Sequence, residues 1–479
     1  MHLLPPAHVH LIAICGTAMA ALAGMLAEKG FRVTGSDANV YPPMSTLLES
    51  LGIDAHKGFD TRHLNPSPDL IVVGNAVSRG NPEVEAMLDL RIPYMSLPEA
   101  VRELFLRGRR PIVITGTHGK TTTTAMTAHL LDSGGLHPSF LIAGMPANFP
   151  RSFGLGAGEF YVIEGDEYDS AFFAKTAKFF HYMPEVLVVN SIEFDHADIY
   201  RDLDEIRRAF RQVVNMVPGN GLLLACCDDP EAARLVPDSP APVETFGLEA
   251  GAYWRATDIV DGVGTGGCSP ICEFTVSRHG EPIGRTTLPM LGRFNIRNAL
   301  AAIAAASYAG VPFHDACSGL ASFRGVKRRQ EIIGNIDGIL LIDDFAHHPT
   351  AVGETLSGLR SAHGDRRIWA IFEPASATNA RSRFEPQYLE AFAPADHVVV
   401  GRVPRPERSR DDEPFSGSRL AARLSNRGTP ARHIEDPREL LAHLAEELES
   451  GDLVIFMSNG SFAGLQSRLH QALQAEYGM

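Results

Sequence analysis

Positive charge is scarcer than negative charge in this sequence. The 479 residues include 43 Lys and Arg against 57 Asp and Glu, which gives a formal net charge of −14. A nucleic-acid partner held by bulk electrostatics is therefore disfavoured. Anionic substrates must instead be held by local groups, such as loop amides and individual arginines.

Cysteine is also rare, with six residues in the whole chain. Cys226 and Cys227 are adjacent, and three residues separate Cys268 from Cys272, but no histidine stands beside either pair at ligand spacing. This pattern disfavours a zinc site. We expect reduced, structural thiols in a cytosolic protein.

Long hydrophobic runs are missing, with one partial exception. Residues 11–27, LIAICGTAMAALAGMLA, carry no charge. The residues before them contain two prolines and no Lys or Arg, which is unlike a signal peptide, and glycine and alanine make the run weakly apolar for a membrane span. We predict a buried strand over Val9–Ile14 that turns into a small-residue helix, in a cytoplasmic protein with no membrane partner.

A glycine fingerprint for dinucleotides is absent from the first strand–helix turn. The opening segment alternates strands and helices, which predicts a parallel, doubly wound sheet. The motif G-x-G-x-x-G would place glycines where Ala13, Cys15 and Ala18 stand, and only Gly16 lies in the turn. A nicotinamide oxidoreductase is thus disfavoured, but the helix N-terminus still offers an anion site. Asp37, at the end of the second strand, can meet a ribose, so we predict a different nucleotide diphosphate.

The most specific motif present is PIVITGTHGKTTTT, over Pro111–Thr124. A short apolar strand runs into glycine, lysine and four threonines, and a helix is expected to follow. This arrangement is typical of a P-loop, in which backbone N–H groups and the lysine face phosphates and a hydroxyl reaches Mg²⁺. The generic pattern would have glycine at Ile114, so the loop is a narrower variant. We predict that the chain binds a nucleoside triphosphate.

Acidic side chains follow two apolar strands of the same predicted sheet. FYVIEGDEYDS and EVLVVNSIEFDHAD end in polar groups suited to holding Mg²⁺ around phosphates, namely Glu164, Asp166, Glu167, Asp169, Asp195 and His196. Because the carboxyl ends of parallel strands share one edge, these groups are expected near the P-loop. Taken singly, each acid is better explained as a solvated turn residue, but as a set after two apolar strands they favour a metal-binding role.

The remaining sequence completes a three-domain α/β prediction. LGRFNIRNALAAIAAA predicts a loop and an alanine-rich helix with Asn295 and Asn298 near its start, where one of them can be a helix cap. Strands with helices between them then predict a second doubly wound sheet. We place a Rossmann-like domain at 1–107, a P-loop ATP-binding domain at 108–324 and a Rossmann-like domain at 325–479.

Six motifs in one order give the chain a resemblance to a known family. They are G-T-H-G-K-T-T-T, E-x-D-E, N-x-I-E-x-D-H, G-x-x-N-x-x-N, F-x-G-V-x-R-R and D-D-F-A-H-H-P. Together they resemble the Mur ligases, the ATP-dependent amide-forming enzymes of bacterial cell-wall synthesis, over essentially the whole chain. The resemblance implies an N-terminal domain for a UDP-sugar, a central ATPase and a C-terminal domain that closes over the site and binds the peptide.

Within that family, two branches use UDP-N-acetylmuramic acid as the first acceptor. One adds L-alanine, and the murein peptide ligases add the recycled tripeptide L-alanyl-γ-D-glutamyl-meso-diaminopimelate. The segment Gly35–Glu49, the longer stretch from Glu164 to His196, and the sequence DDFAHHPTA are similar to the tripeptide-adding branch. Later-step members carry a carbamylated lysine at about the position of Phe210, so they are disfavoured. The alanine-adding branch and a P-loop ATPase without ligase activity remain the alternatives.

The resemblance also implies residue roles. A carboxylate and a triphosphate, which are both anions, must meet in the reaction. At an effective dielectric of about 20, the repulsion between two unit charges about 4 Å apart is about 4 kcal/mol. Cations are therefore required at the site. Lys120 is expected at the β- and γ-phosphates, Thr121 and Glu164 at one Mg²⁺, His196 at a second, and Arg329 at the γ-phosphate. The remaining expected ATP contacts are Gly116, Thr117, His118, Gly119, Thr122, Asn295, Asn298, Asp344 and His348. The expected UDP-sugar contacts are Cys15, Gly16, Thr17, Ala18, Met19, Ser36, Asp37 and Asn75.

Two departures from the family pattern concern binding. Phe294 replaces a common histidine before Asn295 and could stack on adenine. Ala375 stands where the tripeptide-adding branch has arginine in E-P-R-S-N-T, a natural partner for a peptide carboxylate. Arg381 or Arg383 could substitute for it. The protein is expected to be a monomer or a weak homo-oligomer.

Overall fold

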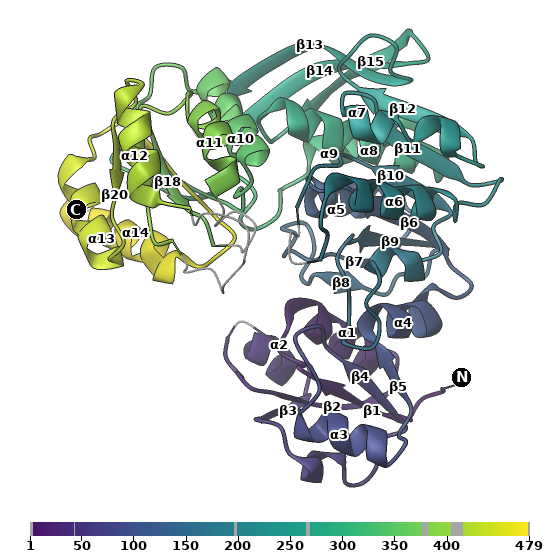
Figure 1. Ribbon diagram of the computed structural model, residues 1–479. Coiled ribbons are helices and arrows are strands. Elements are labelled where there is room, and N and C mark those ends of the chain that lie inside the picture. Colours follow the sequence, from purple (N-terminus) through teal and green to yellow (C-terminus); the bar gives the residue numbers. More distant parts are fainter. Residues whose placement is uncertain are drawn as a thin grey trace. The chain divides into compact units, whose positions relative to one another are not determined.

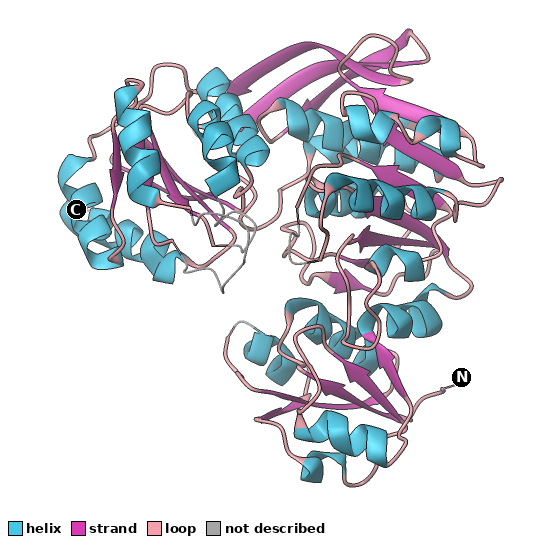
Figure 2. Cartoon of the chain, in the orientation of Figure 1, coloured by secondary structure: helices cyan, strands magenta, loops and turns pink. Residues whose placement is uncertain are grey.

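The computed structural model describes residues 3–42, 44–195, 199–264, 269–375, 382–403 and 415–477. It is an α/β protein with three sheets flanked by helices (Figures 1 and 2), which confirms the predicted fold class. The chain divides into two compact units: residues 1–194, 202–253 and 301–316 form unit 1, and residues 195–201, 254–300 and 317–479 form unit 2. Among the helices described here, none is long and apolar enough to cross a membrane.

The first sheet, in unit 1, is parallel with strand order β3-β2-β1-β4-β5. This is the order of the doubly wound dinucleotide folds, as the strand–helix alternation predicts. The uncharged run, residues 11–27, covers the end of buried β1 and all of α1 except its last residue, and Met19–Leu26 of this helix are buried. The strands are β1 (His8–Ile12), β2 (Arg32–Asp37), β3 (Asp54–Lys57), β4 (Leu70–Val73) and β5 (Tyr94–Ser96), and the helices are α1 (Thr17–Glu28), α2 (Met44–Ser50), α3 (Pro82–Asp89) and α4 (Leu97–Val101).

The second sheet contributes the order β12-β11-β10-β6-β9-β7-β8 to unit 1. Its strands are β6 (Arg110–Thr115), β7 (Ser139–Leu141), β8 (Phe153–Gly154), β9 (Phe160–Gly165), β10 (Val186–Val189), β11 (Leu222–Cys226) and β12 (Val243–Gly247). Apart from β8, which is antiparallel to β7, the pairings described within this part are parallel, so the ends of β6, β9 and β10 lie on one edge. The helices are α5 (Lys120–Ser133), α6 (Leu203–Val214) and α7 (Pro230–Ala233).

Unit 2 begins with an antiparallel meander that the sequence analysis did not foresee. It consists of β13 (Trp254–Val263), β14 (Pro270–Arg278) and β15 (Glu281–Leu288). Helices α8 (Arg293–Tyr308) and α9 (Phe313–Ala321) follow in the chain. Cys15, Cys226, Cys227, Cys272 and Cys317 are free thiols, as expected for the residues that the structure describes.

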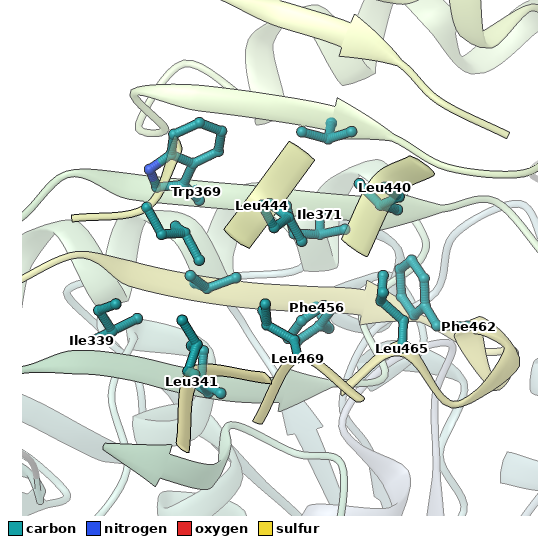
Figure 3. Packing of buried hydrophobic residues seen from close by; sticks show 14 of the residues in the cluster. Ile339, Leu341, Trp369, Ile371, Leu440, Leu444, Phe456, Phe462, Leu465 and Leu469 are labelled. Carbon is teal, nitrogen blue, oxygen red and sulfur yellow. The ribbon is translucent and has the colours of Figure 1, made fainter. Parts of the chain in front are cut away.

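The third sheet has the order β16-β17-β21-β18-β19-β20 and is parallel except for β16. Its strands are β16 (Glu331–Ile336), β17 (Ile339–Asp344), β18 (Ile368–Glu373), β19 (His397–Val400), β20 (Ala431–His433) and β21 (Leu453–Ser458). The accompanying helices are α10 (Pro349–Ala362), α11 (Glu385–Ala391), α12 (Gly417–Asn426), α13 (Pro437–Glu447) and α14 (Leu465–Tyr477). Figure 3 shows one face of this sheet, where Ile371 and Phe456 pack with Leu444 of α13 and Leu469 of α14.

Candidate active site

The P-loop lies between β6 and α5, as its sequence predicts. Gly116 and Gly119 have φ values of 129° and 80°, which favour glycine, and Gly119 caps the helix. A side chain at Gly116 would also meet the backbone nitrogen of Ser191 at 2.9 Å, so the loop packs closely on the end of β10. The Thr117 N–H donates to the Ser191 carbonyl at 2.8 Å, and the His118 N–H donates to the Ser191 hydroxyl at 3.1 Å. The loop is therefore held rigidly at the edge of the sheet.

Lys120 begins α5 and its ammonium folds back over the loop. It donates to the Gly116 carbonyl at 2.6 Å and to Glu167 at 2.8 Å. Burial opposes its charged form, but the carboxylates of Glu167 and Asp166 outweigh this effect, and the pKa of Lys120 lies above its ordinary value. The lysine is thus a fixed positive charge where a phosphate-binding loop needs one.

Glu164 and Thr121 lie next to each other, which sequence order alone could only suggest. The Thr121 hydroxyl donates to a Glu164 oxygen at 3.0 Å, and the Ala143 N–H donates to the other oxygen at 2.5 Å. Burial, with Asp166 nearby, raises the pKa of Glu164 to about 7. A hydroxyl and a carboxylate are hard oxygen donors of the kind that Mg²⁺ prefers, so this pair fits a magnesium ion. Thr122 is buried behind them.

His118 and Thr117 of the P-loop both contact Glu193, which follows β10. The His118 ring nitrogen Nε2 lies 3.0 Å from a Glu193 oxygen, and the Glu193 N–H donates to the Thr117 hydroxyl at 2.8 Å. These contacts join the loop to the segment after β10 that leads to His196. His196 itself lies outside the described residues, so its predicted metal role stays a prediction.

A cavity of about 430 Å³ lies at the ends of the first-sheet strands. Its lining includes nearly all of the predicted UDP-sugar residues: Cys15, Gly16, Thr17, Ala18, Met19, Asp37 and Asn75. Gly16 caps α1 without any side-chain hydrogen bond, so backbone N–H groups of the helix start are available to an anion. Asn39, Tyr41, Tyr168 and Lys178 also line the cavity, and sequence reasoning missed all four.

Asp37 and Ser36 have different surroundings although they are neighbours. Asp37 lines the cavity and accepts from the Cys15 N–H at 2.9 Å, which braces the turn before α1. Ser36 is fully buried and donates its hydroxyl to Glu83, so its side chain supports the sheet and is not part of the cavity lining.

In unit 2, the two predicted adenine residues belong to a buried amide network. Asn295 and Asn298 lie inside α8, so neither caps the helix. Asn295 donates to the Leu291 carbonyl at 2.8 Å, and Asn298 donates to the Asn295 oxygen at 3.2 Å. Gln330, which sequence reasoning missed, accepts from the Leu291 N–H and donates to its carbonyl, each at 3.1 Å. Phe294 is the second residue of the same helix and is only partly buried.

Asp344 and Arg329 lie near each other in unit 2. The Gln330 and Ala346 N–H groups each donate to the Asp344 carboxylate at 2.7 Å. Burial raises the pKa of Asp344 to about 6, and Arg329 opposes that rise. The Arg329 guanidinium lies 4.6 Å from the Phe345 ring centroid, so the phenylalanine of D-D-F-A-H-H-P orients this arginine.

The other predicted residues of unit 2 follow β17 and β18 in the chain. His348 caps α10 and its ring packs edge-on against Phe384 at 5.3 Å. Ala375 lies close to Gly460, where an added side-chain carbon would meet the Ala375 Cβ at 3.0 Å. Arg383 is exposed beside Phe384, whereas Arg381 lies outside the described residues.

Phe210 of α6 is fully buried and contacts Phe179, with ring centroids 5.5 Å apart. A phenylalanine side chain has no amine and so cannot form a carbamate. Here Phe210 packs in the core against Phe179 instead. The structure therefore offers no carbamylated lysine at Phe210, which agrees with the sequence analysis.

Comparison with known proteins now decides the family. Three Mur ligase family models match in order: the Mur ligase family, catalytic domain at 8–109, the Mur ligase middle domain at 114–306, and the Mur ligase, glutamate ligase domain at 328–460. The chain belongs to the Mur ligase family. As a Mur ligase, it is an ATP-dependent enzyme that forms carbon–nitrogen bonds.

Individual relatives cover nearly all of this Mur ligase. It is 39% identical to the UDP-N-acetylmuramate--L-alanyl-gamma-D-glutamyl-meso-2,6-diaminoheptandioate ligase of Escherichia coli strain K12, over 97% of this chain and 98% of the relative. It is 34% identical to the UDP-N-acetylmuramate--L-alanine ligase of Desulfitobacterium hafniense strain Y51, over 95% and 97%. A crystal structure of a murein peptide ligase from Psychrobacter arcticus 273-4 is 36% identical, with a TM-score of 0.71 and 98% coverage of both chains.

Proposed function

We propose that this Mur ligase joins UDP-N-acetylmuramic acid to the tripeptide L-alanyl-γ-D-glutamyl-meso-diaminopimelate, in recycling of cell-wall peptides. The observation that carries the proposal is the 39% identity, over almost the full length, to a relative named for this reaction. The alanine-adding reaction is the second candidate, because relatives named for it are 34% identical over a similar length. We propose that the enzyme acts in the cytoplasm.

The proposed reaction activates a carboxylate and then transfers it to an amine. An oxygen of the lactyl carboxylate attacks the γ-phosphorus of ATP, the bond to the β-phosphate oxygen breaks, and ADP leaves. The free amine of the tripeptide attacks the acyl carbon, loses a proton, and inorganic phosphate leaves. Each molecule of amide therefore consumes one ATP and releases one phosphate.

The P-loop residues supply the positive charge for the first step. Lys120 exchanges its contacts with Gly116 and Glu167 for the β- and γ-phosphates, and the backbone of Gly116–Gly119 surrounds the phosphates. Thr121 and Glu164, together with His196, would hold magnesium, which neutralises phosphate charge when bound. The fit rests on the oxygen donors of Thr121 and Glu164, which lie 3.0 Å apart.

Unit 2 supplies the proposed nucleoside contacts. Asn295 and Asn298 bind adenine by exchanging some of their mutual hydrogen bonds, with His348 nearby, and Asp344 accepts from the ribose. Arg329, oriented by Phe345, binds the γ-phosphate. We retain the domain boundaries 1–107, 108–324 and 325–479, with the first domain binding the UDP-sugar through the cavity residues named above.

Peptide binding is proposed for Arg381 and Arg383, because Ala375 lacks the guanidinium that the family pattern has at its place. Changing either arginine to alanine should raise the Michaelis constant for the tripeptide about 10-fold, because a charge-assisted hydrogen bond to a carboxylate is lost. Steady-state kinetics at saturating ATP and UDP-sugar measure this constant. An unchanged value in both variants rules the two residues out as peptide contacts.

The function is tested by phosphate release from ATP and Mg²⁺ in the presence of UDP-N-acetylmuramic acid. We expect rapid release with the tripeptide and little with L-alanine, and no release when the sugar is omitted. A preference for L-alanine would assign the enzyme to the second candidate reaction. Release that needs neither acceptor would instead indicate an ATPase.

A further inference from the structure

Lys178 is a buried lysine in the stretch between β9 and β10. It begins the short 3-10 helix η3 (Lys178–His181), and only 10% of its side chain is exposed. Its N–H donates to the Tyr168 carbonyl at 3.2 Å, and the next N–H, of Phe179, donates to the Asp166 carbonyl at 3.3 Å. Phe179 is fully buried. The backbone at Lys178 is thus fixed to the end of β9, and its side-chain direction is set by the core.

Within the described part of the chain, one carboxylate contacts the Lys178 ammonium, and the residue also lines a cavity. Its Nζ donates to Asp166 at 3.2 Å and lies 4.0 Å from the centroid of the Tyr168 ring. An ammonium carries three N–H donors, and Asp166 is the one hydrogen-bond partner that the described residues provide for them. Lys178 lines the 430 Å³ cavity at the first sheet, together with Tyr168, and so can offer donors to a ligand there.

Two parts of the chain that differ in chemistry line the cavity. The start of α1 offers backbone N–H groups to an anion such as a diphosphate. The stretch between β9 and β10 contributes Lys178, the single cation among the described lining residues. Its partner Asp166 is followed by Glu167, which contacts Lys120 of the P-loop. Lys178 is therefore linked to Lys120 of the phosphate-binding loop through the neighbouring carboxylates Asp166 and Glu167.

The position of Lys178 indicates which group of the proposed substrate would contact it. A UDP-sugar whose diphosphate binds at α1 would occupy the same cavity that Lys178 lines. The lactyl carboxylate must approach the γ-phosphate of ATP, which binds at the P-loop. A carboxylate in this place would lie beside the buried acids Asp166 and Glu167, so it needs a cation next to it.

We propose that the Lys178 ammonium binds the lactyl carboxylate of UDP-N-acetylmuramic acid and holds it for attack on ATP. The inference rests on the proposed function. It makes Lys178 a specificity residue, because a UDP-sugar without the lactyl group has no carboxylate to offer. Asp166 then acts as a positioning residue that keeps the ammonium in place.

The test is calorimetric titration without ATP, using UDP-N-acetylmuramic acid and its carboxamide, which differ only in the charged group. Wild type should bind the acid about 10- to 100-fold more tightly than the amide, and Lys178→Met should lose this preference while still binding the amide. Lys178→Arg should restore part of the preference. In turnover assays, Lys178→Met should raise the Michaelis constant of the UDP-sugar and leave that of ATP unchanged.

Two further variants separate ligand binding from a structural role. Lys175→Met removes an exposed lysine three residues earlier, which pairs with Asp169 at 2.7 Å and does not line the cavity, and it should change nothing. Lys178→Met with Asp166→Asn removes the ion pair without leaving a buried charge, so it should fold normally and still lack the preference. A Lys178→Met or double variant that keeps the wild-type preference overturns the inference. Wild type that binds neither ligand overturns the proposed function itself.

Discussion

Replacing Lys120 with methionine is expected to reduce ADP formation by about 1,000-fold or more. The side chain keeps its length but loses the charge that lies 2.6 Å from the loop carbonyl of Gly116 and 2.8 Å from Glu167. Preorganised charges of this kind act where negative charge gathers in the transition state, and their removal has large effects on turnover. Phosphate release under saturating substrates measures the loss.

A partner variant shows whether that loss is chemical or structural. Lys120→Met removes the cation beside the buried carboxylate of Glu167, which should lower the melting temperature. Adding Glu167→Gln removes the negative charge at that position, so the double variant should recover stability and remain inactive. UDP-sugar binding should be normal in both. Turnover near the wild-type rate in either variant would mean that this loop does not bind the transferred phosphate.

Changing Glu164 to glutamine is expected to have the second large effect. The amide can keep both contacts, because its oxygen accepts from the Ala143 N–H and its nitrogen can donate to the Thr121 hydroxyl. What is lost is the negative charge that a magnesium ion requires. We expect turnover to fall about 100-fold and the Mg²⁺ concentration for half-maximal activity to rise about 10- to 100-fold.

The stability of this variant provides an internal control. Burial raises the pKa of Glu164 to about 7, above its unfolded value, so ionisation at pH 8 costs stability in the folded protein. Glu164→Gln should therefore melt no lower than wild type at pH 8. Glu159→Gln, an exposed carboxylate at the start of the same strand, should match wild type in Mg²⁺ dependence. A normal Mg²⁺ requirement in Glu164→Gln would remove this residue from the metal site.

The parts of the site that follow chain order were predictable from the sequence. A strand, a glycine loop and a helix place Lys120 and Thr121, and the shared edge of parallel strands brings Glu164 to them. The small-residue run also indicated β1 and α1, because a chain without charges there can only be buried. These predictions depend on local pattern, which the fold preserves.

Other features depend on contacts between distant segments, which leave no local signal. Gln330 has no motif of its own, yet its side chain connects Leu291 to the network of Asn295. Lys178 lies in an aromatic-rich stretch, and from the sequence a lysine is expected at the surface. The fold shows instead that it is buried beside Asp166. The meander of β13–β15 was missed because its strands carry no chemical motif, although they partly alternate exposed and buried residues.

The most direct test of the account is the mass of the product formed when both acceptors compete. The enzyme is given ATP, Mg²⁺ and UDP-N-acetylmuramic acid, with L-alanine and the tripeptide at equal concentration, and the UDP-linked products are separated and weighed by mass spectrometry. We predict that the main product is the sugar nucleotide plus the tripeptide minus one water. A main product that carries a single alanine, or no UDP-linked amide at all, would contradict the proposal.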